Sequence, residues 1–127
     1  AGASFNLSWD NKIAIYVIDV LTKEKMLNNI NEIMDGNPSV ADYRKAAIYF
    51  FEENINIDKA LKWIDIAFKD SDDLPYWQLR YKALIYEKAG KINKAKKYAK
   101  KGYDLALKGN IPDGINTLRI INERLNN

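Results

Sequence analysis

The chain has 127 residues, of which 47% are hydrophobic, enough for one domain with a buried core and too apolar for a disordered chain. It contains no cysteine and no histidine, which excludes thiol nucleophiles, an acid–base group that titrates near neutral pH and the usual zinc ligands. The net charge of +3 is too mild for a dedicated nucleic-acid binder, and no apolar run approaches the roughly 18 residues of a membrane span.

The first predicted element is a β-hairpin over residues 5–18. Every second residue is apolar on either side of Asp10-Asn11, a pair typical of turns. The apolar residues of the two strands are Phe5, Leu7, Trp9, Ile13, Ile15 and Val17. A two-stranded ribbon is only marginally stable in water, so we expect it to pack against the helices or against another molecule.

From Thr22 onward the apolar spacing becomes helical, and local signals mark where each helix begins and ends. Ser39 and Asp42 form a capping-box pattern, Asn56 is a second N-cap, and Pro75 starts a helix where its missing N–H is harmless. The other stop and start signals are Gly36-Asn37-Pro38, Gly90, Gly109 and Pro112-Asp113. The sequence therefore predicts six helices between Thr22 and the C-terminus.

Part of this series repeats. Residues 47–50 (AIYF) match residues 83–86 (ALIY) at an offset of 36, and residues 57–60 (IDKA) match residues 92–95 (INKA) at an offset of 35. A period near 35 that spans two helices is typical of tetratricopeptide repeats. Because two repeats are fewer than the three or so that such stacks need, the flanking helices must cap them. The predicted fold is mostly α, an antiparallel helical-hairpin stack with an N-terminal β-hairpin.

The chain also resembles a bacterial family. The segments Ala46-Ala47-Ile48-Tyr49, Glu53-Asn54 and Ala60-Leu61-Lys62-Trp63-Ile64-Asp65 are similar to the AA-x-Y, EN and AL-x-WI motifs of domain-of-unknown-function family "twenty-nine eleven". Residues 77–83 resemble that family's next helix, and residues 5–20 resemble the ribbon that closes its N-terminal β-domain. The resemblance implies an exported protein of the periplasm or cell envelope of Bacteroidetes-type bacteria, and it implies no catalytic residue.

Family members carry a β-rich domain ahead of the helices, and that domain is missing from this sequence. We therefore expect residues 1–21 to be a β-ribbon left from a preceding β-domain, and residues 22–127 to be a tetratricopeptide-like helical domain. The start at Ala1-Gly2-Ala3 rather than at methionine predicts a processed or trimmed product.

The predicted binding site is a groove that contains Arg44 and Arg80. Each arginine lies three residues before the small residue of its repeat, a position that faces the inner groove of a tetratricopeptide stack. Trp77, Tyr81 and Glu87 are expected to share or border this surface. Because arginine's planar fork suits carboxylates, the groove predicts an acidic protein or peptide partner. The alternative is that both arginines form intramolecular ion pairs and pack their stems on aromatic rings.

Other polar segments predict no chemistry. The lysines of the most basic segment are Lys88, Lys91, Lys94, Lys96, Lys97, Lys100 and Lys101. They lack arginines and an exposed aromatic series, which favours a solvated helix face over a nucleic-acid site. Asp70-Ser71-Asp72-Asp73 lacks the glycine and distal glutamate of a calcium loop, and no serine has a histidine partner. We therefore expect no metal, no cofactor and no enzymatic activity.

The expected function is a non-catalytic protein-interaction or scaffolding module of the tetratricopeptide-like type, since such stacks bind extended peptides or partner helices. The alternative is a purely structural accessory to the missing N-terminal β-domain, which would then carry the function. Neither the partner nor the oligomeric state follows from these residues.

Overall fold

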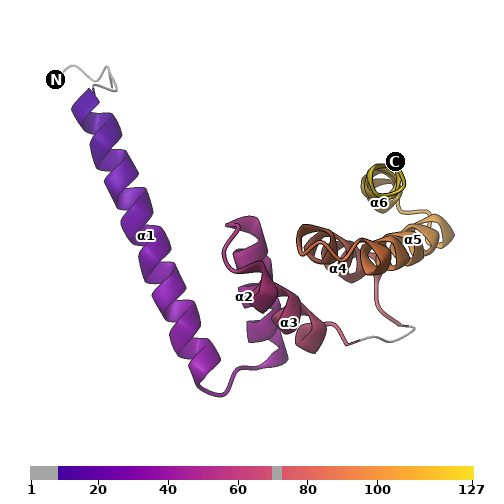
Figure 1. Cartoon of the computed structure of the whole chain (residues 1–127), viewed down its shortest axis with the longest axis horizontal. Coiled ribbons are helices and arrows are strands. Elements are labelled where there is room, and N and C mark those ends of the chain that lie inside the picture. The colour runs from indigo at the N-terminus through magenta and orange to yellow at the C-terminus, as the bar shows by residue number, and fades with distance from the viewer. Residues whose placement is uncertain (1–8, 70–72) are drawn as a thin grey trace. The chain divides into compact units, whose positions relative to one another are not determined.

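The structure, a computed structural model, describes residues 9–69 and 73–127, together with the side chains of residues 12–69 and 73–127. Within these residues the chain forms six helices (Figure 1). They are α1 (Trp9–Asp35), α2 (Val40–Glu52), α3 (Ile57–Ala67), α4 (Tyr76–Lys88), α5 (Ile92–Lys108) and α6 (Pro112–Leu125). The chain divides into two units, Ala1–Pro38 and Ser39–Asn127, so that α1 belongs to the first unit and the other five helices to the second.

The predicted N-terminal hairpin is wrong where the structure describes it. Residues 13–18, the predicted second strand, lie inside α1, while residues 5–8 of the predicted first strand lie outside the described residues. A short apolar run fits a strand and a helix equally well by periodicity. Residues 9–35 contain neither glycine nor proline, so nothing in this stretch interrupts a helix. In a helix each backbone N–H finds a carbonyl partner four residues earlier, whereas a ribbon needs a second strand to supply these hydrogen bonds. The predicted boundary between residues 21 and 22 falls inside the same helix.

The N-terminal half of α1 carries apolar side chains without a single apolar face. Those that are exposed are Ile13, Ile15, Tyr16, Val17, Ile18, Val20 and Leu21. Because they occupy nearly every position of this stretch, α1 lacks the single apolar stripe of an ordinary amphipathic helix.

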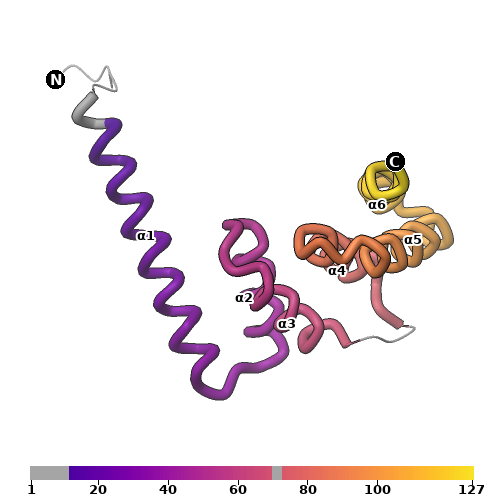
Figure 2. Tube along the Cα trace, viewed as in Figure 1, coloured from indigo at the N-terminus to yellow at the C-terminus, as the bar shows by residue number. Residues whose placement is uncertain are grey.

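In the second unit, helices that are neighbours in the sequence pack together: α2 against α3, α4 against α5, and α5 against α6. Smaller contacts join α3 to α4 and α4 to α6. Figure 2 traces the path of the backbone through these helices. The described chain is therefore mostly helical with packed helices, as the sequence predicted, and in the second unit successive helices pack as neighbours.

The same aromatic contact recurs in the α2–α3 hairpin and in the α4–α5 hairpin. The ring centroids of Phe50 and Trp63 are 4.8 Å apart, and those of Tyr86 and Tyr98 are 5.3 Å apart. Tyr86 follows Phe50 by 36 residues, and Tyr98 follows Trp63 by 35, the two offsets of the sequence repeat. The alanines at the matched crossings are all fully buried, namely Ala47, Ala60, Ala83 and Ala95. The sequence register therefore corresponds to equivalent packing.

Each hairpin turn contains at least one residue with a positive φ, and the α2–α3 turn has a second at Asn56 (29°). The φ angle is 57° at Asn54, 81° at Gly90 and 50° at Asn110. The hydrogen bonds that close these turns run from Ile55 N to Phe50 O (2.8 Å), from Lys91 N to Tyr86 O (2.9 Å) and from Ile111 N to Ala106 O (3.0 Å). Asparagine tolerates this conformation better than most residues, which is how the first hairpin keeps the turn without a glycine.

The predicted N-caps of α2 and α3 are confirmed. Ser39 N donates to Asp42 Oδ2 (2.9 Å), and Asp42 N donates to Ser39 Oγ (3.2 Å), which completes the capping box. Hydrogen bonding from Ser39 to the Asp42 carboxylate, from the backbone N–H foremost, lowers the pKa of Asp42 below its ordinary value. At α3, Lys59 N donates to Asn56 Oδ1 at 3.3 Å. Both helices therefore begin where side chains satisfy their first N–H groups.

Candidate functional site

The five residues predicted to share a groove lie on two helices, Arg44 on α2 and the other four on α4. Arg44 is half-buried, and its guanidinium forms no ion pair with the described part of the chain. No hydrogen bond, ion pair or ring contact joins Arg44 to the four α4 residues within that part. Its donors are therefore available to a partner from outside the described residues.

Arg80 and Glu87 instead form ion pairs with α6. Arg80 Nη1 lies 3.9 Å from Asp113 Oδ2, and its guanidinium carbon lies 5.5 Å from the centre of the Tyr81 ring. Glu87 accepts two hydrogen bonds from Arg124, at 2.8 Å from Nε and 2.5 Å from Nη2, and the bonds to Glu87 raise the pKa of Arg124. Arg80 thus has the intramolecular ion pair and the aromatic neighbour that the alternative to a binding groove described. These two residues of the predicted site therefore help hold α6 beside α4.

Trp77 connects the second hairpin to the first. Its ring meets that of Phe68 edge-on, with centroids 5.7 Å apart and planes at 89°, a favourable geometry for two aromatic rings. Phe68 is the buried C-cap residue of α3. At least part of the Trp77 surface is therefore used within the protein, in the contact between α3 and α4.

The most polar cluster in the interior centres on Lys82, whose side chain is only 2% exposed. Lys82 Nζ lies 3.7 Å from Asp65 Oδ1 and 4.8 Å from the centre of the Tyr98 ring. The Tyr86 hydroxyl donates to Asp65 Oδ2 at 2.6 Å. The cluster thus joins α3, α4 and α5 through one carboxylate. Because Lys82 is covered and lies beside a carboxylate, its role here is structural rather than nucleophilic.

Sequence reasoning missed Lys82, although the repeat contained a signal. At the offset of 36 that relates the first helices of the two hairpins, Lys82 corresponds to Ala46. Ala46 is buried, and it is followed by the alanine that aligns with Ala83. A lysine aligned with a core alanine indicates a buried charge that needs a partner from another helix. The partner, Asp65, lies 17 positions earlier, a separation that gives no local clue.

The lysines of α5 surround its buried stripe. That stripe consists of Ala95, Tyr98, Ala99, Gly102 and Ala106. Exposed lysines lie outside this stripe, namely Lys94, Lys97, Lys100 and Lys108, with Lys91 just ahead of the helix. Two of them lie near tyrosine rings: Lys94 Nζ is 5.6 Å from the Tyr86 centroid, and Lys97 Nζ is 5.7 Å from that of Tyr98. These lysines are therefore exposed, as the predicted solvated face requires.

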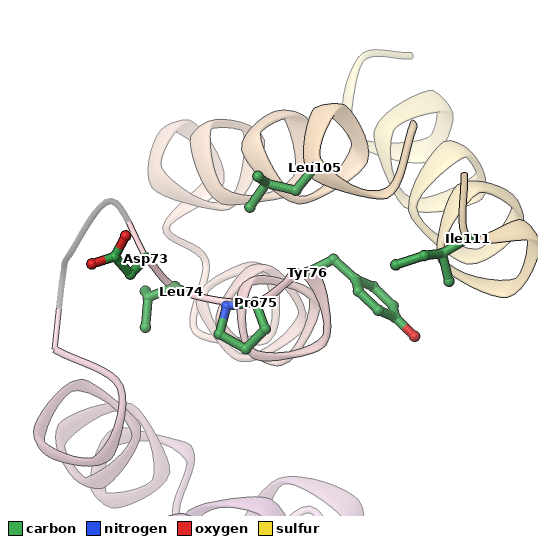
Figure 3. A pocket seen from close by; sticks show the side chains of 6 residues that line it. All are labelled: Asp73, Leu74, Pro75, Tyr76, Leu105 and Ile111. Atoms are coloured by element: carbon green, nitrogen blue, oxygen red, sulfur yellow. The ribbon is translucent and has the colours of Figure 1, made fainter. Parts of the chain in front are cut away.

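A shallow pocket of about 390 Å³ lies where the start of α4 meets the end of α5. Its lining consists of Asp73, Leu74, Pro75, Tyr76, Leu105 and Ile111. Figure 3 shows the Tyr76 ring extending from the start of α4 toward the side of Ile111. Most of this lining is apolar, without the several converging polar groups that orient a small-molecule ligand, so the pocket is a weak candidate for such a site.

Comparisons with family models, curated proteins and solved structures find no match to this chain. Among the described residues, no helix is long and apolar enough to cross a membrane. The same residues contain no group of three or more carboxylates placed to hold a metal ion. The predicted acidic segment falls partly on residues 70–72, which lie outside the described residues.

Proposed function

We propose that the chain is a non-catalytic protein-interaction or scaffolding module of the tetratricopeptide-like type. The observation that supports this proposal is the repeated hairpin, with the Phe50–Trp63 contact matched by Tyr86–Tyr98 and the Asn54 turn matched by Gly90. Stacked hairpins of this kind form extended surfaces that bind peptides and helices. The resemblance to family "twenty-nine eleven", and the export that it implies, belong to the same proposal.

Arg44 is the residue of the predicted groove best placed to take part in such binding. Its guanidinium has no carboxylate partner in the described chain, whereas Arg80 lies beside Asp113. An unpaired arginine offers a fork of donors that fits a carboxylate with two parallel hydrogen bonds. The proposed partner is therefore a protein segment with at least one acidic side chain.

The test is a selection of peptides from a random display library on the full chain, followed by titration of the enriched peptides. We expect saturable binding that weakens in Arg44→Ala and in the Arg44→Ala/Arg80→Ala pair. Arg119→Ala is the matched control, because Arg119 is exposed on α6 and contacts only Asn116 (3.4 Å) among the described residues. Circular dichroism confirms that each variant is folded.

The interaction function and the role of the arginine groove would be contradicted by two different results. Failure to enrich any peptide that binds saturably would contradict the interaction function. Binding that is equal in wild type and in both Arg44 variants would contradict the arginine groove while leaving an interaction module in place.

A further inference from the structure

We propose that a basic stripe at the α4–α5 corner binds an acidic segment of a partner protein. The stripe consists of Lys88, Lys91, Lys94 and Lys97, four lysines spaced three residues apart. This inference rests on the proposed interaction function and assigns the acidic partner to residues other than those of the predicted arginine groove.

The positive charge of the chain is concentrated in the segment that holds this stripe, from the end of α4 to the end of α5. Residues 88–108 contain eight lysines and one acidic residue, Asp104, which gives this segment a formal charge of +7 against +3 for the whole chain. The remaining residues therefore carry a net charge of −4. Such an asymmetry produces a local positive potential that attracts and orients anionic partners.

The lysines of the stripe are not neutralised within the described chain. Their ammonium groups form no ion pair with a carboxylate there. The nearest cluster, around Asp65, already contains Lys82 at 3.7 Å. Lys94 and Lys97 lie near the tyrosines of that cluster and form no ion pair of their own with a described carboxylate. An acidic side chain from outside would therefore gain ion pairs without displacing any described ones.

Three of these lysines have their ammonium groups close to aromatic rings. Lys88 Nζ donates to Phe51 O at 3.2 Å and lies 5.0 Å from the centre of the Phe51 ring. Lys94 and Lys97 lie over Tyr86 and Tyr98. Cation–π contacts restrict a long side chain that otherwise loses rotamer entropy on binding. The stripe is therefore partly ordered before a partner arrives.

The surface fits an acidic protein segment better than a nucleic acid. The Tyr86 and Tyr98 rings are 3% and 4% exposed, so bases cannot stack on them as they do in single-strand binders. The stripe has no arginine to grip phosphates with two bonds. Ile92, directly after Lys91, is exposed and offers an apolar contact for a side chain of the bound segment. We therefore expect a segment with several glutamates or aspartates and an apolar residue among them.

The test is fluorescence anisotropy of the full chain with a labelled peptide of alternating glutamates and leucines, and with its glutamine counterpart. We expect saturable binding of the glutamate peptide alone, weakening as salt rises because exposed charges are screened. Lys94→Glu/Lys97→Glu should weaken binding by about tenfold or more. Lys59→Glu/Lys62→Glu, at two exposed lysines of α3 outside the stripe, makes the same charge change and should have a clearly smaller effect.

Equal weakening by the two lysine pairs would overturn the stripe in favour of diffuse attraction. Absence of binding by the glutamate peptide would also overturn the stripe. Peptides enriched in the display selection would in that case still support an interaction module. Loss of binding in Arg44→Ala with no change in Lys94→Glu/Lys97→Glu would place the acidic partner in the arginine groove instead. Tighter binding to vesicles with anionic lipid, or to a single-stranded oligonucleotide, would overturn the choice of a protein partner.

Discussion

Arg124, on α6, donates two hydrogen bonds to the carboxylate of Glu87, on α4, from Nε at 2.8 Å and from Nη2 at 2.5 Å. Together with the approach of Arg80 to Asp113, it links the two helices near both ends of α6. Neither contact is local in the sequence, since Glu87 and Arg124 are 37 residues apart. Arg80 and Glu87, which were predicted from the sequence to lie in the arginine groove, therefore help to hold α6 in position.

Arg124→Lys is expected to keep the charge and lose the paired geometry. A lysine ammonium cannot reproduce the planar fork, so the free energy of unfolding should fall by about 0.5–1 kcal/mol, the range of a well-formed but partly exposed pair. Urea unfolding measures this difference. Arg119→Lys, on the same helix with one long contact to Asn116, should change stability by less than about 0.3 kcal/mol, and an equal loss in both variants would contradict the role of the fork.

The buried lysine gives an asymmetric prediction. Lys82→Met removes the covered cation and leaves Asp65 Oδ1 without it, but the Asp65 side chain is 42% exposed and can turn toward water, so the cost should stay near about 1 kcal/mol. Asp65→Ala removes the carboxylate 3.7 Å from the buried Lys82 ammonium and should cost about 2 kcal/mol, less than a fully buried pair because Asp65 is 42% exposed. Chemical denaturation compares them, with Asp104→Ala as an exposed control. A larger cost for Lys82→Met than for Asp65→Ala would contradict this account of the cluster.

Gly114 is expected to be intolerant of a side chain. A Cβ at this position would lie 2.7 Å and 2.8 Å from two carbons of the Tyr76 ring and 3.0 Å from Ala106 Cβ. Gly114→Ala should therefore overpack the contact of α6 with α4 and α5 and cost about 1–3 kcal/mol. Gly36→Ala is the control, because a Cβ there would meet nothing closer than 3.5 Å. Thermal melting distinguishes the two, and an unchanged melting temperature for Gly114→Ala would show that Tyr76 moves aside freely.

The capping box predicts a pH dependence. Since the hydrogen bonds from Ser39 lower the pKa of Asp42 in the folded chain, its contribution to stability is complete above the ordinary pKa of an aspartate. That contribution is lost as the pH falls through the lowered pKa. Asp42→Asn, which resembles the protonated acid, should therefore destabilise the chain more at pH 7 than near pH 2. Denaturation at both pH values measures this, and an equal loss at both would show that the charge of Asp42 is irrelevant.

The sequence by itself determined the local features of the second unit. Ser39, Asn56 and Pro112 begin helices, and Gly90 occupies a left-handed turn that closes a hairpin. Each of these effects is decided within about four residues, by a side chain that satisfies a helix end or by a backbone freed from a Cβ. The repeat offsets also related the Phe50–Trp63 pair to the Tyr86–Tyr98 pair, because equivalent residues of equivalent hairpins have equivalent neighbours.

Only the tertiary structure decided the rest. Residues 13–18 fit a strand or a helix by periodicity, and the choice depended on whether a second strand was there to pair with. Lys82 is buried because Asp65 and Tyr98 arrive from two other helices. Arg80 and Glu87 are drawn into ion pairs because α6 packs beside α4. In each case the deciding partner is distant in the chain, and burial or pairing exists only once the helices have come together.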